Sequence, residues 1–236
     1  MGFDFTGRRV LVAGGSRGIG RAIALGFAQA GAQVSACARG ADGLSALQAE
    51  GVAHVMPTDL ADAGQIHAWV AAAAQALGGI DVLVNNASGF GMGDTEVGWR
   101  RGLDVDVMAT VRASTAALAH LRAAKGCIVN TTSISGLGPS VRTPAYAAVK
   151  ALVINYTASQ AAALARDGVR VNAIAPGSIE FPGGTWEKRR AEDPALYNRI
   201  LAGIPFGRLG TPEEVADVAL FLASPLARWV TGQTIV

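Results

Sequence analysis

Cysteine is scarce in this sequence of 236 residues, which has only Cys37 and Cys127, in separate strand-like segments. Two distant cysteines give neither a disulfide framework nor the ligand spacing of a metal site. We therefore expect buried thiols, no bound metal and a reducing compartment, the cytoplasm. The opening segment MGFDFTGRRV also has no apolar signal core, which favours the same compartment.

Long apolar runs and blocks of like charge are also missing. The longest apolar run, AWVAAAAQALGGI, is too short to cross a bilayer, which argues against a membrane protein. The 20 basic and 18 acidic residues are spread along the chain with a net charge of +2, which argues against nucleic-acid binding. Half of the residues are hydrophobic, enough for one large core, so we expect residues 1–236 to form a single domain.

The sequence does contain a regular alternation of short β-rich runs with longer helical patterns. The runs RVLVAG, QVSACA, VAHVMP and IDVLVNN are followed by helical segments at 18–30, 42–50, 62–77 and 95–123. CIVNTTS, VRVNAIAP and QTIV continue the alternation around helices at 144–166 and 212–223. This pattern predicts an α/β fold with a doubly wound parallel sheet covered by helices on both faces. The Pro/Gly-rich, charged segment 178–204 interrupts the pattern and is predicted to be a lid.

The start of the last helix is the best defined boundary. In TPEEVADVALFLAS, Thr211 is placed to cap the helix and Pro212 suits the first helical position. Glu214 completes a capping box with Thr211. These signals predict a helix that begins at residue 212.

A glycine-rich turn follows the first strand, with the spacing Gly-x-x-x-Gly-x-Gly in AGGSRGIGRAIALGFAQAG. Glycine lets a tight turn bring backbone amides against a pyrophosphate at the positive end of a helix dipole. Glycines alone also close a helix onto a strand, but the strand before this turn and the helix after it favour a dinucleotide site. The predicted contacts are Gly14, Ser16, Arg17, Gly18, Ile19 and Gly20.

The second strand ends in Cys37-Ala38-Arg39, without the carboxylate that usually selects NAD. Arg17 and Arg39 near one ribose suit a 2′-phosphate through charge-assisted bonds, so NADP(H) is favoured over NAD(H). The alternative is that both arginines are solvated surface residues. Asp42 is a second candidate for the ribose, although its position suits a cap of the next helix better.

A tyrosine and a lysine lie four residues apart in TPAYAAVKALV, within an otherwise apolar helical pattern. This spacing brings Tyr146 and Lys150 together on one helix face. A neutral tyrosine is a serviceable acid at neutral pH, and a nearby ammonium favours its phenolate. With Ser133, at the end of CIVNTTS and placed to hold a carbonyl oxygen, they predict a catalytic trio. The alternative is a buried aromatic beside a snorkelling lysine.

From about residue 5 to the C-terminus, these motifs resemble the classical short-chain dehydrogenases/reductases. The resemblance rests on GGSRGIG, DL at 59–60, NNA at 85–87, Ser133 with YAAVK, VNAIAPG at 171–177 and GRLGTPEEVADVALFLAS. It implies a Rossmann-like sheet of about seven strands and hydride transfer between a nicotinamide and a carbonyl or secondary alcohol carbon. It also implies that Tyr146 is the acid/base, that Ser133 orients the oxygen, and that Lys150 binds the nicotinamide ribose and favours the phenolate.

The resemblance implies further cofactor contacts. It places the DL and NNA motifs beside the adenosine half and the Pro-Gly segment along the nicotinamide carboxamide. The residues concerned are Asp59, Leu60, Asn85, Asn86, Ala87, Pro176, Gly177 and Ile179. Taken singly, each also has a plain structural explanation as a strand-ending turn, a helix cap or a chain reversal.

The sequence departs from the family pattern in several places. Asp106, in LDVDVMAT, stands where the family usually has an asparagine that serves a proton path from the lysine, so we include it among the catalytic residues. An ionised Asp106 near Lys150 would offset the field of the ammonium, and we expect an active enzyme with a shifted pH optimum. Phe181 stands where a threonine often contacts the cofactor, and Ala13 where the glycine loop often has one. Relatives usually continue after TGQTIV through an Asp-Gly-Gly segment that contributes to subunit contacts and to the substrate pocket.

Candidate pocket walls at 88–94, 137–142 and 178–204 are mostly apolar, which favours a medium-sized hydrophobic carbonyl substrate. The pattern is similar to 3-oxoacyl-carrier-protein reductases, ketone reductases and sugar alcohol dehydrogenases, and no residue chooses among them. The rival hypothesis is a cofactor-binding scaffold or regulatory protein with little turnover. The helices at 95–123 and 144–166 resemble those that relatives pair across a two-fold axis, which predicts a homo-oligomer, a tetramer or a dimer.

Overall fold

The computed structural model describes residues 2–236, which form one seven-stranded parallel sheet in the order β3-β2-β1-β4-β5-β6-β7. The strands are β1 (Arg9–Ala13), β2 (Gln33–Ala38), β3 (His54–Pro57), β4 (Val82–Asn85), β5 (Cys127–Thr131), β6 (Arg170–Ile174) and β7 (Thr234–Ile235). The predicted α/β, doubly wound, Rossmann-like fold is confirmed. No helix among residues 2–236 has the length and apolar character needed to traverse a bilayer.

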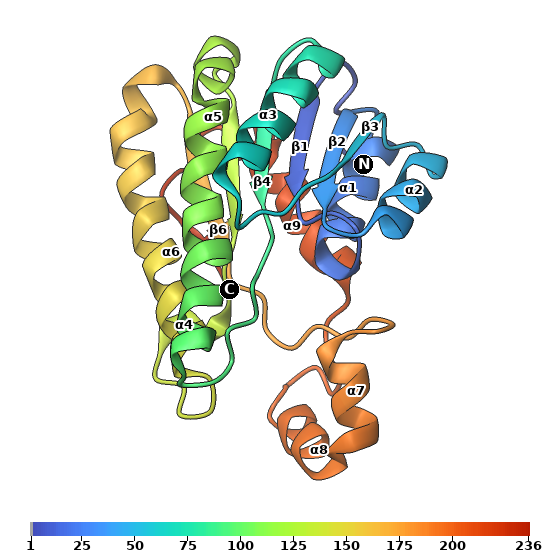
Figure 1. Cartoon of the computed structure of the whole chain (residues 1–236), viewed down its shortest axis with the longest axis vertical. Coiled ribbons are helices and arrows are strands. Elements are labelled where there is room, and N and C mark those ends of the chain that lie inside the picture. Colours follow the sequence, from blue (N-terminus) through green and yellow to red (C-terminus); the bar gives the residue numbers. More distant parts are fainter. Residues whose placement is uncertain (1) are drawn as a thin grey trace.

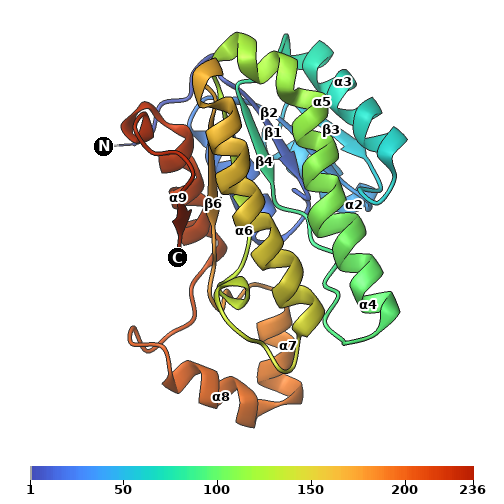
Figure 2. The same cartoon turned by 90° about the vertical axis from the view of Figure 1, so that its left-hand side faces the viewer.

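Helices cover both faces of the sheet (Figure 1). The α-helices are α1 (Gly18–Gln29), α2 (Ala41–Ala49), α3 (Ala63–Leu77), α4 (Glu96–Arg101), α5 (Ala109–Ala124), α6 (Pro144–Leu164), α7 (Thr185–Glu192), α8 (Pro194–Ala202) and α9 (Pro212–Ala223). Short helical turns lie at η2 (Ile134–Leu137), η3 (Ala165–Asp167) and η4 (Pro225–Ala227). In Figure 2, α5 and α6 run side by side across one face of the sheet.

Alternate residues of each central strand point into two separate hydrophobic layers. Along β1, Val10 and Val12 join the layer under α1 and α9, whereas Leu11 and Ala13 join the layer under α3 and α5. All four side chains are buried. Burial on both faces explains why the strands read as continuous apolar runs instead of alternating ones.

The predicted start of α9 is confirmed, because Thr211 and Glu214 form the capping box. The expectation that Asp42 caps the next helix is wrong: Gly40 occupies the N-cap of α2, and Asp42 lies in the first turn, where it meets the positive end of the helix dipole. Asp62 caps α3 by accepting a hydrogen bond from the Gln65 amide.

The predicted helix over 95–123 has a break in its hydrogen-bond pattern. Between α4 and α5 lies a seven-residue π-helical segment, η1 (Gly102–Met108), that widens the turn. Gly102 lies so close to α6 that an added Cβ would be 3.1 Å from the Val149 Cγ1 atom. The wider turn directs Asp106 inward, where it is buried. Such segments are rare and occur frequently at functional sites.

Segment 178–204 contains α7 and α8, which extend beyond the sheet at the lower end of Figure 1. A short two-stranded stem joins it to the body, where Ile179 pairs with Gly210 and the Glu180 amide donates to the Gly210 carbonyl at 2.9 Å. Within the segment, the rings of Trp186 and Tyr197 pack edge to face.

Candidate active site

The predicted site residues lie where the parallel strands end. The strand order reverses between β1 and β4, so the loops after these two strands diverge and leave a crevice, the usual place for a dinucleotide in such sheets. β1 leads into the glycine turn, β4 into the NNA motif, β5 into Ser133 and β6 into the Pro-Gly segment. Segments far apart in the sequence therefore meet at one edge of the sheet.

The glycine turn is held by the ends of the neighbouring strands. The amides of Gly14 and Gly15 donate to the Cys37 carbonyl at 2.9 and 3.0 Å, and the Asn86 side chain donates to the Gly14 carbonyl at 3.0 Å. A Cβ on Gly14 would lie 2.9 Å from the Ala87 Cα atom, so the turn packs directly on the end of β4. Asn86 and Ala87 thus shape the phosphate cradle through its backbone.

α1 begins at Gly18, at the end of this turn, and no side chain in the described part of the chain caps it. The first amides of a helix have no partner within the helix, and here they point out at the positive end of the helix dipole. Such a terminus suits an anion, so the turn fits a pyrophosphate group. A cavity of about 280 Å³ beside the turn is lined by Ser16, Arg17, Gly18, Arg21, Ala22, Phe181, Pro182, Pro212 and Glu213.

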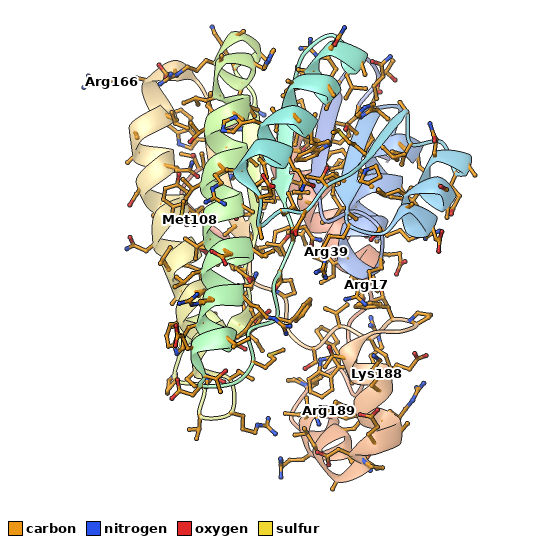
Figure 3. The ribbon with its side chains drawn as sticks, in the orientation of Figure 1. Arg17, Arg39, Met108, Arg166, Lys188 and Arg189 are labelled. Carbon is orange, nitrogen blue, oxygen red and sulfur yellow. The ribbon has the colours of Figure 1, made fainter. Side chains whose placement is uncertain are left out.

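The two predicted arginines lie on one side of the molecule, near the ends of β1 and β2 (Figure 3). Arg17 and Arg39 are both exposed, whereas Arg21 pairs with Glu50 at 2.6 Å. Both guanidinium groups are therefore accessible to an anion at this corner.

The adenine side of the predicted site has one exposed and one buried member. Asp59 is exposed, and its carboxylate accepts the Ala61 amide at 3.0 Å. Leu60 belongs to the hydrophobic layer under α3. Asp59 therefore makes a local turn, and the expected helix cap at this position is supplied by Asp62 instead.

Phe181 covers part of the glycine turn. Its Cζ atom would lie 2.5 Å from a Cβ placed on Gly18, so the ring rests on the bare glycine backbone. Gly18 has a positive φ of 53°. The residue that replaces the usual threonine thus contacts the turn through an apolar ring instead of a hydroxyl.

Tyr146 and Lys150 lie one turn apart near the start of α6. The Lys150 Nζ atom is 5.6 Å from the centroid of the Tyr146 ring. Ser133 follows β5 and is buried, and its hydroxyl accepts the Ser135 amide at 3.1 Å, which starts a short helical turn packed against α6. The turn that follows Ser133 therefore packs against the helix that carries Tyr146 and Lys150.

The ammonium of Lys150 is almost completely buried, with 3% of its side chain exposed. It donates to the Thr131 carbonyl at 3.0 Å and lies 2.9 Å from the Asp106 Oδ1 atom. Burial by itself lowers the pKa of Lys150, but the Asp106 carboxylate and the Tyr146 phenol outweigh it and raise that pKa above its ordinary value. Lys150 is therefore held as an ammonium across the neutral range.

Asp106 divides its two carboxylate oxygens between different elements. Oδ1 faces Lys150 on α6, and Oδ2 accepts the Gly89 amide, in the loop after β4, at 2.9 Å. The side chain is fully buried. The ion pair with Lys150 that the departure from asparagine suggested is present.

The asparagines of the NNA motif have different surroundings. Asn85 faces away from the glycine turn, and its amide donates to Asn130 at 2.9 Å and to Ser114 at 3.2 Å. Asn130 in turn donates to Thr157 at 2.9 Å. This buried polar chain links β4 and β5 to α5 and α6.

The Pro-Gly segment lies beside the serine strand. The Ile134 amide donates to the Pro176 carbonyl at 3.2 Å, which ties this segment to the residue after Ser133. Gly177 is exposed, and Ile179 forms the stem of segment 178–204.

Phe90 lies in the predicted pocket wall 88–94, but the sequence assigns it no individual role. The ring of Phe90 lies parallel to that of Tyr146, with centroids 6.3 Å apart and an interplanar angle of 5°. The glycines on both sides of Phe90 indicated a turn, but nothing in SGFGMGD indicated which way the ring points.

Comparison with known proteins finds matches over nearly the whole chain. The family model described as Enoyl-(Acyl carrier protein) reductase matches residues 13–236. Isoepoxydon dehydrogenase patN of Penicillium expansum is 38% identical over 238 residues, which cover 96% of this chain and 91% of that protein.

Two solved structures match over nearly the whole chain. A 7α-hydroxysteroid dehydrogenase in complex with NADH and 7-oxo glycochenodeoxycholic acid has a TM-score of 0.91 and 30% identity, over 98% of this chain and 93% of that chain. An NADPH-bound short chain oxidoreductase from Pseudomonas aeruginosa, described as containing an atypical catalytic center, has a TM-score of 0.88 and 35% identity, over 99% and 96% of the two chains. The predicted family is confirmed: the chain belongs to the short-chain dehydrogenases/reductases, oxidoreductases that act on alcohol and carbonyl groups.

Proposed function

We propose that this protein is an NADP(H)-dependent oxidoreductase that interconverts a carbonyl compound of mostly apolar character and its secondary alcohol. The observation that carries the proposal is the buried Lys150 ammonium, 5.6 Å from the Tyr146 ring at the edge of the sheet where Ser133 also lies. A buried charge is costly unless it is paired, as Lys150 is with Asp106, and a buried charged group beside a phenol marks a candidate functional site.

In this proposal the bound nicotinamide supplies or accepts a hydride at the carbonyl carbon. In the reductive direction, Tyr146 donates its proton to the carbonyl oxygen, and the Ser133 hydroxyl holds that oxygen in place. The Lys150 ammonium stabilises the phenolate that Tyr146 becomes, and the Thr131 carbonyl and Asp106 keep the ammonium in position. In oxidation the same residues act in reverse.

The proposed cofactor contacts are the glycine turn from Gly14 to Gly20, the DL and NNA motifs, and the segment from Pro176 to Ile179. The similar solved structures contain NADH in one case and NADPH in the other, so they do not decide between the two cofactors. The proposed preference for NADP(H) therefore rests on Arg17 and Arg39. Both guanidinium groups are exposed at the end of the crevice where a 2′-phosphate would lie.

Titration with each reduced cofactor tests this preference. Arg39→Asp is expected to weaken NADPH binding about 10-fold to 100-fold, as expected for loss of a charge-assisted bond, and to leave NADH binding nearly unchanged. Arg166→Asp is the matched control, because Arg166 is exposed at the far end of the molecule (Figure 3). Unchanged NADPH binding in Arg39→Asp would remove the case for a phosphate site.

A screen of ketones with both reduced cofactors tests the activity itself. Loss of nicotinamide absorbance is expected with NADPH, and Tyr146→Phe is expected to abolish it while NADPH binding remains. NADPH binding without turnover of any carbonyl compound would favour the rival, a cofactor-binding scaffold or regulatory protein.

A carrier-protein substrate, as in 3-oxoacyl-carrier-protein reductases, is the alternative within the same reaction class. The basic rim that such a partner needs would come from Lys188, Arg189 and Arg190 on α7 (Figure 3). Arg190 is already paired with Glu180 at 3.2 Å. The rim is thus partly neutralised, which favours a free small molecule, and a comparison of carrier-bound and free substrates would decide between them.

Self-association belongs to the same proposal. The stretch from α4 to α6 carries four exposed apolar side chains, Val97, Leu103, Met108 and Leu152. Exposed apolar groups on adjacent helices favour pairing of two copies through this face. Light scattering is expected to give the mass of a dimer or a tetramer, and a monomer at micromolar concentration would contradict it.

A further inference from the structure

Phe90 is an unusual residue for its place. It lies in the turn after β4 with a positive φ of 48°, a conformation that bulky side chains rarely adopt. Its side chain is also 46% exposed, so burial of the ring does not explain why an aromatic residue is kept there. A strained backbone and an exposed aromatic ring at one residue beside a proposed catalytic phenol call for a functional explanation.

The turn is fixed on both sides. The Gly89 amide donates to Asp106 Oδ2 at 2.9 Å, and the Phe90 amide donates to the Ser88 hydroxyl at 3.1 Å. A Cβ on Gly91 would collide with the Gly98 carbonyl of α4. The position of Phe90 is therefore set by packing and hydrogen bonds, and it is not that of a free loop side chain.

A continuous series of contacts around the proposed site, called the circuit below, connects Tyr146 to Phe90. Tyr146 and Lys150 share one face of α6, Lys150 pairs with Asp106, and Asp106 holds the Gly89 amide. Phe90 follows Gly89 and returns to Tyr146 with its ring parallel to the phenol ring. The same carboxylate thus positions the ammonium that acts on Tyr146 and the turn that carries Phe90.

This circuit places an aromatic wall beside the proton donor. A carbonyl oxygen that accepts a hydrogen bond from Tyr146 brings the group attached to its carbon close to this wall. Aromatic faces interact best with flat groups in offset-stacked or edge-on contact. A conjugated substituent stays in the plane of the carbonyl and offers such a surface, whereas a puckered saturated ring of the same size does not.

We infer that Phe90 determines specificity and favours carbonyl compounds conjugated to a flat apolar group, enones or aryl ketones, over saturated ketones of the same size. The inference rests on the proposed carbonyl reduction. The carbonyl carbon receives the hydride from the reduced nicotinamide, its oxygen receives the proton from Tyr146, and the conjugated double bonds stay intact.

The test compares matched substrate pairs: cyclohexenone with cyclohexanone, and acetophenone with acetylcyclohexane. For each pair the ratio of kcat/KM, conjugated over saturated, is measured with NADPH. Phe90→Leu is expected to lower this ratio about 5-fold to 10-fold, the loss expected of an aromatic contact. Phe90→Tyr keeps the ring and is expected to retain the ratio, and Phe206→Leu, at a phenylalanine that is 90% exposed outside the site, is the matched control.

The ratio of kcat/KM values distinguishes a role of Phe90 in substrate specificity from a purely structural role. A purely structural role predicts equal losses for both members of a pair, so an unchanged ratio in Phe90→Leu overturns the inference while the proposed function stands. Phe90→Met is measured in parallel, and its ratio decides if the leucine variant does not fold. A wild-type ratio below one also overturns the inference, and absence of turnover with every ketone overturns it together with the proposed function.

Discussion

The buried ion pair of Asp106 and Lys150 predicts that Asp106→Asn changes the pH dependence of turnover. Oδ1 of Asp106 lies 2.9 Å from Nζ of Lys150, which lies 5.6 Å from the centroid of the Tyr146 ring. The carboxylate therefore offsets part of the field that the ammonium exerts on the phenol. Asparagine keeps the size of the side chain and removes this opposing charge, so the phenolate becomes easier to form.

The size of the effect follows from these distances. These two distances limit the separation between the carboxylate and the Tyr146 ring, and a unit charge at about 8 Å contributes about 2 kcal/mol at an effective dielectric constant of about 20. We expect the pH profile of the variant to move toward lower pH, by less than the unscreened interaction would give. The assay is alcohol oxidation with the oxidised cofactor, followed through nicotinamide absorbance from about pH 5 to about pH 10.

Asp104→Asn is the matched control, because Asp104 lies in the same π-helical segment and is exposed. It is expected to leave the profile unchanged. A profile for Asp106→Asn that coincides with that of the wild type would refute the reasoning, because it would mean that the carboxylate exerts no field on the phenol.

The same substitution has a stability consequence. Asparagine has a single acceptor oxygen and cannot serve both Lys150 and the Gly89 amide, so we expect a loss of about 2 to 4 kcal/mol in the free energy of unfolding. The folded-state pKa of Lys150 is raised, so the stability from the pair is fully present below the ordinary lysine pKa of about 10.4 and is lost as the pH rises through the raised value. The difference from the wild type is therefore expected to shrink as the solution becomes strongly alkaline, as measured by urea unfolding.

Three further substitutions test the fold around the site. Gly20→Ala places a methyl group on the carbonyl oxygen of the glycine turn and is expected to lower both cofactor affinity and Tm, measured by fluorescence titration and thermal unfolding; retained affinity would contradict the tight packing. Thr211→Ala removes the cap of α9 and is expected to cost about 1 kcal/mol in urea unfolding. Arg208 and the Thr211 amide hold the pKa of Glu214 at about 2, so its contribution to stability is present above its ordinary value and is lost as the pH falls through about 2. In a plot of the free energy of unfolding against pH, Glu214→Gln is expected to reduce the loss of stability in acid. An unchanged plot would show that solvent screens the pair of Arg208 and Glu214.

Much of the fold and part of the site could be predicted from the sequence, because the sequence signals that specify them are local. Alternating β-rich and helical patterns specify the strands and helices, and α9 begins at Pro212 as Thr211 and Glu214 indicate. The glycine turn and the spacing of Tyr146 and Lys150 each need only a few neighbouring residues to be recognised. The prediction that Asp42 caps α2 is wrong because the backbone angles at a single position define a capping residue. A shift of two residues places Asp42 in the first turn of the helix instead.

Local sequence determined the strands, the helix starts and the identity of the reactive groups, because these depend on side-chain periodicity and backbone preference. Tertiary structure alone decided their partners. The π-helical segment directs Asp106 to Lys150 because close packing at Gly102 sets its register against α6, and the turn after β4 brings Phe90 onto Tyr146 through contacts between different elements. Phe181 rests on Gly18, a contact between residues too distant in sequence for any periodicity to encode.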